Sequence, residues 1–166
     1  MRTVYHYVGI TAAVACLTAA PAHSDADNVA LTVDIEGTEG NVVNSIDLTL
    51  ADLQALPVVE FDTTTIWTSG TQVFTGVRLA ALLDSFDIDS GELKLYALND
   101  YHITMPVSEA LEADALLAYW RNDAVMTPRE NGPLWLLYDY DSDPKYRAET
   151  YYARSIWQLY RITVSR

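Results

Sequence analysis

The feature that most constrains the fold is a succession of short apolar segments, each closed by a turn signal. Residues 29–35 alternate apolar with polar side chains, and residues 58–67 are rich in Val, Thr and aromatic residues, so both ranges predict β-strands. Further strands are expected at 42–48, 92–98, 101–105, 115–120, 124–126, 134–138 and 156–164. The turn pairs Asn99-Asp100 and Asn122-Asp123 predict two hairpins.

A few short helices are expected between these strands. Leu79, Leu82, Leu83 and Phe86 recur at helical spacing and predict an amphipathic helix over 78–86. Thr49 and Asp52 resemble a capping box for a helix that ends before Pro57, and Ser108-Glu109 is expected to cap another helical turn. There is no regular βαβ alternation, so the fold class is α+β, a compact single domain of mixed short strands and a few short helices.

The first 22 residues have the pattern of a secretory signal peptide. Arg2 gives a weakly basic start, an apolar core follows from Val8 to Leu17, and Ala20-Pro21-Ala22 forms a small-residue cleavage site. We therefore expect a signal peptide at 1–22, a single domain at 23–166 and a periplasmic protein without direct membrane insertion. The alternative is a lipoprotein acylated at Cys16, which Ala13 disfavours because lipoproteins usually have Leu there.

The chemistry available from residue 23 onward is narrow. The only cysteine of the chain is Cys16, and His102 is the only histidine expected within the fold. This excludes thiolate nucleophiles and zinc sites of the Cys/His kind. A calcium loop at Asp139, Asp141 and Asp143 is disfavoured because Pro144 replaces the required glycine. No Gly-x-Ser-x-Gly elbow accompanies His102, which disfavours a hydrolase.

The charge balance is strongly acidic. Residues 23–166 contain 9 basic and 23 acidic side chains, so the net charge of this part is about −14. Such a field repels nucleic acid and anionic lipid, and neither is expected as a partner. A pocket for a flat ligand is instead suggested by Gly132–Trp157, which contains two Trp, five Tyr and two Arg.

Five segments resemble, in order, the molybdopterin-binding domain of the sulfite oxidase family. They are FTGVRLAALL (74–83), LYALNDYHITMP (95–106), ALLAYWRNDAVM (115–126), GPLWLLYDYD (132–141) and RSIWQLYRITV (154–164). The resemblance covers roughly residues 28–166 and is strongest to short, exported, single-domain relatives, some of which bind pterins without molybdenum. It implies the fold of that domain.

Two departures bear on the activity that the resemblance implies. Family enzymes hold molybdenum partly through a cysteine thiolate, and no cysteine follows Cys16. Carboxylates and hydroxyls do not replace this soft ligand. The basic residue that the family places just before the final-strand Trp is replaced by Ile156. We therefore expect the fold to be kept and the oxidoreductase chemistry to be lost, with no molybdenum bound.

The resemblance implies a pterin ligand, which needs an aromatic platform for its face and placed polar groups for its edge. Candidate binding residues are Trp67, Arg78, Asn99, Tyr101, Trp135, Tyr138, Arg154 and Trp157. Each has a structural alternative: the Trp residues could fill the core, Asn99 and Tyr101 could serve the turn, and Arg154 could pair with Asp139, Asp141 or Asp143. Arg78 could be a surface residue or pair with a neighbouring carboxylate. The scarcity of cations favours a non-phosphorylated, tetrahydropterin-like ligand.

The leading functional hypothesis is a non-catalytic pterin-binding protein of the periplasm. The resemblance implies that it regulates the periplasmic domain of a membrane signalling receptor, in some relatives one that controls cyclic-di-GMP. The alternatives are a molybdopterin-dependent oxidoreductase or its subunit, and a plain interaction module with a vestigial pocket.

Overall fold

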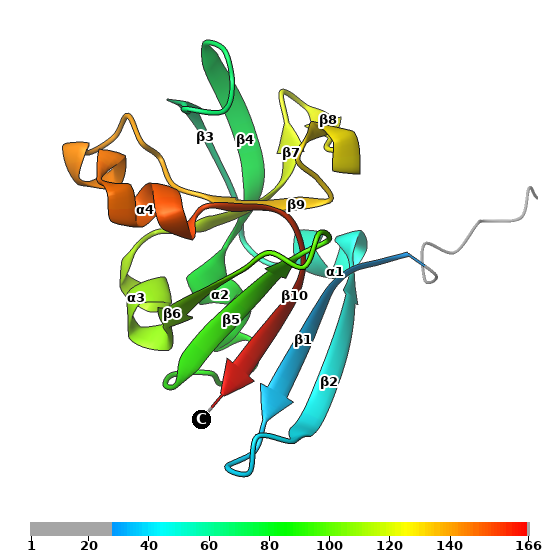
Figure 1. The fold of residues 1–166 in the computed structure, drawn as a ribbon. Coiled ribbons are helices and arrows are strands. Elements are labelled where there is room, and N and C mark those ends of the chain that lie inside the picture. Colours follow the sequence, from blue (N-terminus) through cyan, green and yellow to red (C-terminus); the bar gives the residue numbers. More distant parts are fainter. Residues whose placement is uncertain (1–27, 166) are drawn as a thin grey trace, which may run out of the picture.

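The computed structural model describes residues 28–165, which form one small, mainly β domain (Figure 1). The expected mixture of short strands and a few short helices is confirmed, with the balance towards strands. The strands of the described residues are β1 (Val29–Glu36), β2 (Val42–Thr49), β3 (Val58–Thr64), β4 (Thr71–Arg78), β5 (Glu92–Ala97), β6 (His102–Pro106), β7 (Leu116–Arg121), β8 (Ala124–Val125), β9 (Leu134–Leu137) and β10 (Ile156–Ser165). The predicted signal peptide lies outside the described residues.

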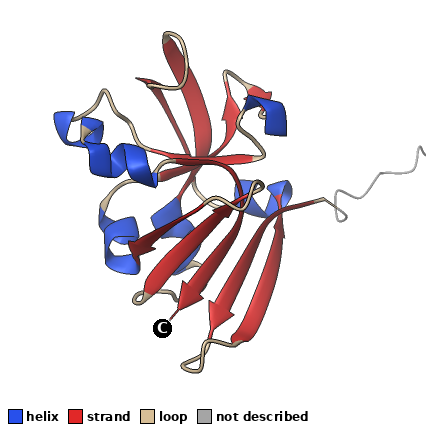
Figure 2. Ribbon diagram, in the orientation of Figure 1, coloured by secondary structure: helices blue, strands red, loops and turns tan. Residues whose placement is uncertain are grey.

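The helices are short and lie outside the curved sheet (Figure 2). They are α1 (Leu50–Gln54), α2 (Leu79–Asp84), α3 (Val107–Glu112) and α4 (Glu149–Arg154), with 3-10 turns η2 (Pro128–Glu130) and η3 (Pro144–Arg147). No helix in the described part of the chain is both long and apolar enough to cross a membrane.

The long strand β10 connects the two halves of the sheet. The strand order is β2-β1-β10-β9-β7-β4-β3, with β5 also paired to β10, β6 paired to β5, and β8 paired to β7. The start of β10 pairs with β9, whereas its later residues pair with β5 and run parallel to β1. In Figure 1 the strands around β9 therefore lie above those around β5, and β10 passes from one group to the other.

A β-bulge marks the change of partner along β10. The register shifts between Trp157 and Leu159, and the intervening Gln158 has a positive φ of 55°. Its backbone N–H donates to the carbonyl of Asn131 (2.9 Å), and its side-chain amide donates to the carbonyl of Pro128 (2.7 Å). Its own carbonyl accepts from the N–H of Leu98 (3.0 Å). These bonds hold a left-handed residue in place and join three segments at one point.

The core lies beneath the central strands. All four residues of β9 are buried, as expected for a strand that is covered on both faces. Leu79, Leu82 and Leu83 of α2 are buried, which confirms the predicted apolar face. A Cβ at Gly76 of β4 would lie 2.2 Å from the carbonyl oxygen of Leu117 on β7, so this close strand pair requires glycine.

Several local predictions are confirmed and others are corrected. The capping box is present: Thr49 Oγ1 accepts from the Asp52 N–H (3.2 Å), and the Asp52 carboxylate accepts from the Thr49 N–H (2.8 Å). The strand expected at 58–67 ends at Thr64, since the chain turns away before Trp67. The expected cap at Ser108 is wrong, because α3 already begins at Val107 after an uncapped Pro106.

Candidate functional site

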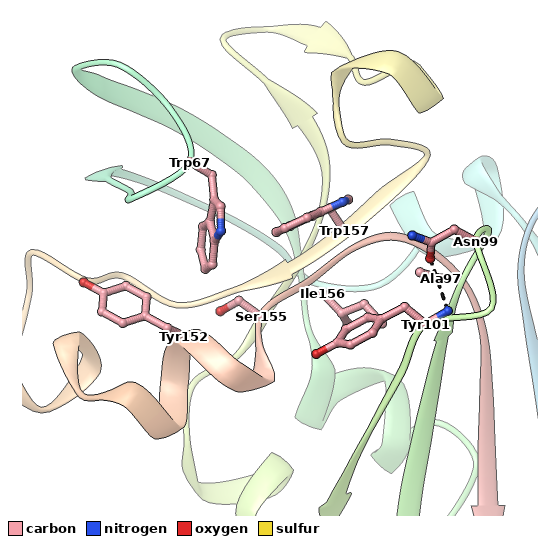
Figure 3. Close-up of a pocket in the computed structure, with 8 residues that line it drawn as sticks. All are labelled: Trp67, Ala97, Asn99, Tyr101, Tyr152, Ser155, Ile156 and Trp157. Carbon is pink, nitrogen blue, oxygen red and sulfur yellow. Dashed lines mark hydrogen bonds between the residues drawn. The ribbon is translucent and has the colours of Figure 1, made fainter.

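A cavity of about 310 Å³ opens where three segments from different parts of the chain converge (Figure 3). The segments are the β3–β4 loop, the β5–β6 turn, and the junction of α4 with β10. The residues that line the cavity are Trp67, Ala97, Asn99, Tyr101, Tyr152, Ser155, Ile156 and Trp157. Its size and its aromatic walls are typical of a small-molecule site.

Trp67 forms one wall and is held by its own loop. Thr65 Oγ1 accepts from the backbone N–H of Trp67 (3.1 Å) and from that of Thr68 (2.9 Å). The end of β3 is fixed by Asp141, whose carboxylate accepts from the N–H (2.7 Å) and the hydroxyl (2.8 Å) of Thr64. The Thr64 backbone bond is the main cause of the lowered pKa of Asp141, and Arg147 at 2.6 Å lowers it further.

The Trp67 ring packs edge to face against four other aromatic rings. The centroid separations are 5.6 Å to Trp157, 5.8 Å to Tyr152, 5.9 Å to Trp135 and 6.2 Å to Tyr140. Such T-shaped contacts fix ring orientation because the edge of one ring meets the face of another. The wall of the cavity is thereby pre-formed, and a flat ligand would meet rings that are already in place.

The α4–β10 junction contributes Tyr152 and Ser155. Ser155 Oγ donates its proton to the carbonyl of Tyr151 (2.8 Å), so the hydroxyl of Tyr140, at 2.5 Å, is the donor to Ser155. Tyr140 stacks against Tyr152 at 5.0 Å with an interplanar angle of 27°. Burial raises the pKa of the Tyr140 hydroxyl, which therefore stays protonated and fixes this corner of the cavity.

The β5–β6 turn forms the remaining wall. Asp100 takes a positive φ of 63°, and the Ala97 N–H donates to the carbonyl of Tyr101 (2.8 Å) to close the hairpin. Asn99 Oδ1 accepts from the N–H of Tyr101 (3.2 Å). The Tyr101 side chain is 54% exposed although it also lines the cavity, so this turn reaches both the ligand space and the solvent.

None of the described residues that line the cavity carries a charge. The two arginines expected at the site bind protein groups elsewhere and do not line the cavity. Arg154 on α4 forms an ion pair with Glu109 on α3, and not with any of the aspartates at 139, 141 and 143. Arg78 donates to the backbone carbonyl of Asp114, and its Nε lies 3.9 Å from the carboxylate of that residue.

The structure brings together half of the eight predicted site residues. Trp67, Asn99, Tyr101 and Trp157 line the cavity. Trp135 is fully buried behind Trp67 and Trp157, so it supports the wall without lining it. Tyr138 is also fully buried, stacked on Tyr146 at 5.6 Å, and burial raises the pKa of its hydroxyl.

Sequence reasoning missed the cavity residues contributed by α4 and its end. Tyr152 and Ser155 lie between the strands expected at 134–138 and 156–164, where no helix was predicted. The available signal was the group of aromatic residues Tyr151, Tyr152 and Trp157 just before and at the start of the final strand. Such a group favours an ordered segment whose rings pack together. Ile156 was noted only as a departure from the family, whereas it lines the cavity.

The oxidoreductase molybdopterin-binding domain family has a model that matches residues 18–140. The chain belongs to this family. A search of curated proteins found no significant match. The matched region contains the cavity residues Trp67, Ala97, Asn99 and Tyr101, while the wall formed by 152–157 lies beyond it.

The lining of the cavity can be compared with each part of a molybdopterin-type cofactor: the pterin ring, the metal and the phosphate. A pterin ring is flat and polar-edged, and this cavity offers aromatic faces with amide, hydroxyl and indole groups around them. Residues 28–165 contain no cysteine, so this part of the chain supplies no thiolate for molybdenum. Within the same residues no cluster of three His, Cys, Asp or Glu side chains could hold a metal ion. The uncharged lining also offers a phosphate no cationic partner.

Proposed function

We propose that this chain binds a non-phosphorylated, tetrahydropterin-like ligand without catalysing a reaction on it. The observation that carries the proposal is the cavity itself, with the Trp67, Trp157 and Tyr152 rings around an uncharged interior. The aromatic rings would stack on the faces of the heterocycle, and the turn at Asn99 would meet its edge.

Titration of the purified full chain with tetrahydropterin under anaerobic conditions tests this proposal. Because Trp67 and Trp157 line the cavity, binding should quench their fluorescence at micromolar ligand, and calorimetry should give a stoichiometry near one. Absence of both signals would favour a vestigial pocket and would reject the proposal.

The family match favours one other function, a molybdopterin-dependent oxidoreductase or a subunit of one. This alternative requires a metal donor other than a cysteine of residues 28–165. Elemental analysis of the protein purified from a molybdenum-replete host separates the two functions. Stoichiometric molybdenum would establish the alternative, whereas a co-purifying metal-free heterocycle supports our proposal.

We further propose that ligand occupancy regulates a membrane signalling receptor through its periplasmic domain, in the manner of relatives that control cyclic-di-GMP. Tyr101 supports this, because an exposed side chain that also lines the cavity can change its surroundings when the cavity fills. Regulation requires that ligand and receptor domain each alter the affinity of the other by the same factor. Measuring receptor-domain affinity with and without tetrahydropterin tests this, and equal affinities would reject it.

The periplasmic location is part of the same proposal. Its support is the signal pattern in residues 1–22. Mass spectrometry of the exported protein should show a new terminus at His23, whereas a lipid-modified Cys16 would show that the chain is a lipoprotein.

A further inference from the structure

The orientation of the Asn99 side chain determines what the cavity can recognise. The Tyr101 backbone N–H, 3.2 Å from this amide, can only donate, so the atom that faces it must be Oδ1. The Nδ2 group, with two N–H donors, is left on the side of the cavity, and Figure 3 shows it directed towards Trp157. Asn99 therefore presents donors to a ligand.

The two indole side chains of the lining add donors of the same kind. Indole nitrogens donate and do not accept. In Figure 3 the Trp157 nitrogen lies on the side of Asn99, and the Trp67 nitrogen lies on the side of Trp157. Around the Asn99 end of the cavity the side-chain groups left for a ligand are thus N–H donors, which suit the carbonyl oxygens and ring nitrogens of a heterocycle.

A matching set of strong side-chain acceptors is absent from the lining as far as the structure describes it. The amino-bearing edge of a pterin carries adjacent N–H donors, and a carboxylate is the side chain that accepts from such a pair most strongly. No Asp or Glu of residues 28–165 lines the cavity. Ser155 Oγ already bonds to Tyr151 and Tyr140. The hydroxyls of Tyr101 and Tyr152 can donate as readily as accept, so they do not select for this edge.

We infer that the site selects a neutral pteridine by its carbonyl edge, through N–H donors of Asn99 and Trp157. No side chain of the described lining selects for its amino-bearing edge. This inference rests on the proposed function and adds the ligand class: oxo-pteridines in general, with lumazines accepted alongside pterins. Asn99 is then the residue that sets specificity, because its amide supplies two of the donors from a fixed orientation.

Calorimetry of the full chain with tetrahydropterin and with tetrahydrolumazine, under anaerobic conditions, tests the inference. The two ligands differ by a carbonyl in place of the amino group. We expect dissociation constants within about threefold of each other, since a group that is not recognised costs little to replace. Lumazine binding that is weaker by about tenfold or more would overturn the inference while leaving pterin binding intact. Failure of both ligands to bind would overturn the proposed function as well.

The variant Asn99→Asp tests the same inference from the protein side. Aspartate still accepts from the Tyr101 N–H but replaces the donors with an acceptor oxygen. Binding of both ligands should weaken by about tenfold or more. Tighter pterin binding would show that the amino-bearing edge faces this residue and would overturn the inference.

Asn122→Asp is the matched control for that variant. Asn122 also lies in a hairpin turn, and its Oδ1 also accepts from a backbone N–H, that of Val73 at 2.9 Å. It does not line the cavity, so the same chemical change should leave both affinities unaltered.

Discussion

Trp157 on β10 lies directly opposite Trp135 on β9, and their rings meet edge to face with centroids 6.2 Å apart and an interplanar angle of 81°. Trp135 is fully buried, whereas Trp157 is partly exposed and lines the cavity. One cross-strand pair therefore joins the core to the candidate site. Because Trp157 is held against the buried Trp135, this wall of the cavity is already ordered before a ligand binds. Such preorganisation lowers the entropic cost of binding.

Truncating Trp157 should weaken ligand binding without unfolding the protein. In Trp157→Leu the ligand loses one stacking surface, and we expect about tenfold weaker binding of tetrahydropterin, equivalent to about 1.4 kcal/mol. Fluorescence titration, followed through the remaining Trp residues, measures the change. Trp120→Leu is the control, because Trp120 pairs with Val125 in the β7–β8 hairpin and does not line the cavity. Equal affinities for the two variants would place the ligand elsewhere.

Local sequence signals were sufficient for most of the strands and for the α2 core face. Alternation at 29–35 and turn pairs such as Asn122-Asp123 act over a few residues, and the structure has β1 and the β7–β8 hairpin there. Helix α4 was not predicted, because its six residues show no apolar periodicity and the contact of Tyr152 with the Trp67 ring joins residues distant in sequence. Packing, and not local propensity, selects that helix.

The candidate site was only partly predictable for the same reason. The distinction between Trp157, which lines the cavity, and Trp135, which lies behind it, depends on strand pairing and on the bulge at Gln158. The pairing of Arg154 with Glu109 joins two helices 45 residues apart in sequence, which no local pattern in that segment indicates. Residue types could suggest a flat-ligand site, whereas the tertiary pairing decides which residues line it.

At the bulge residue Gln158, the side-chain hydrogen bond should stabilise the fold and the left-handed backbone should destabilise it. Gln158→Ala removes the hydrogen bond to the Pro128 carbonyl but keeps the strained φ, and should lower the free energy of unfolding by about 1 kcal/mol. Gln158→Gly also loses that bond, yet glycine adopts positive φ without strain and should recover up to about 1 kcal/mol relative to alanine. Urea denaturation measures both. A glycine variant less stable than the alanine variant would contradict this account.

The Asp141 tether should make the Trp67 loop sensitive to acid. The pKa of Asp141 is lowered in the folded protein, so its stabilising contribution is present above the ordinary aspartate value of about 4 and is lost as the pH falls through the lower folded value. At neutral pH, Asp141→Asn should cost about 1 kcal/mol, a small value because the carboxylate is partly exposed. Thermal unfolding across the acidic range should show the two proteins converging below about pH 4.

Asp89→Asn is the control for the Asp141 experiment. Asp89 is exposed and its carboxylate accepts only a local bond from the Ser90 hydroxyl. At neutral pH its replacement should leave the free energy of unfolding within about 0.5 kcal/mol of that of the unaltered protein. If Asp141→Asn behaves in the same way, the carboxylate does not hold the loop.

Arg154 should matter for stability and not for ligand affinity. Its guanidinium pairs with Glu109, both side chains are mostly buried at 20% and 29% exposure, and neither residue lines the cavity. Arg154→Met leaves the Glu109 carboxylate without its partner and should lower the free energy of unfolding by about 2 kcal/mol. Adding Glu109→Gln to this variant removes the unpaired charge and should restore part of the lost stability. Tetrahydropterin affinity should stay within about threefold of the unaltered protein, as it should in Arg129→Met, the exposed control on η2. A tenfold loss of affinity at unchanged stability would instead assign Arg154 to the ligand, as the sequence had suggested.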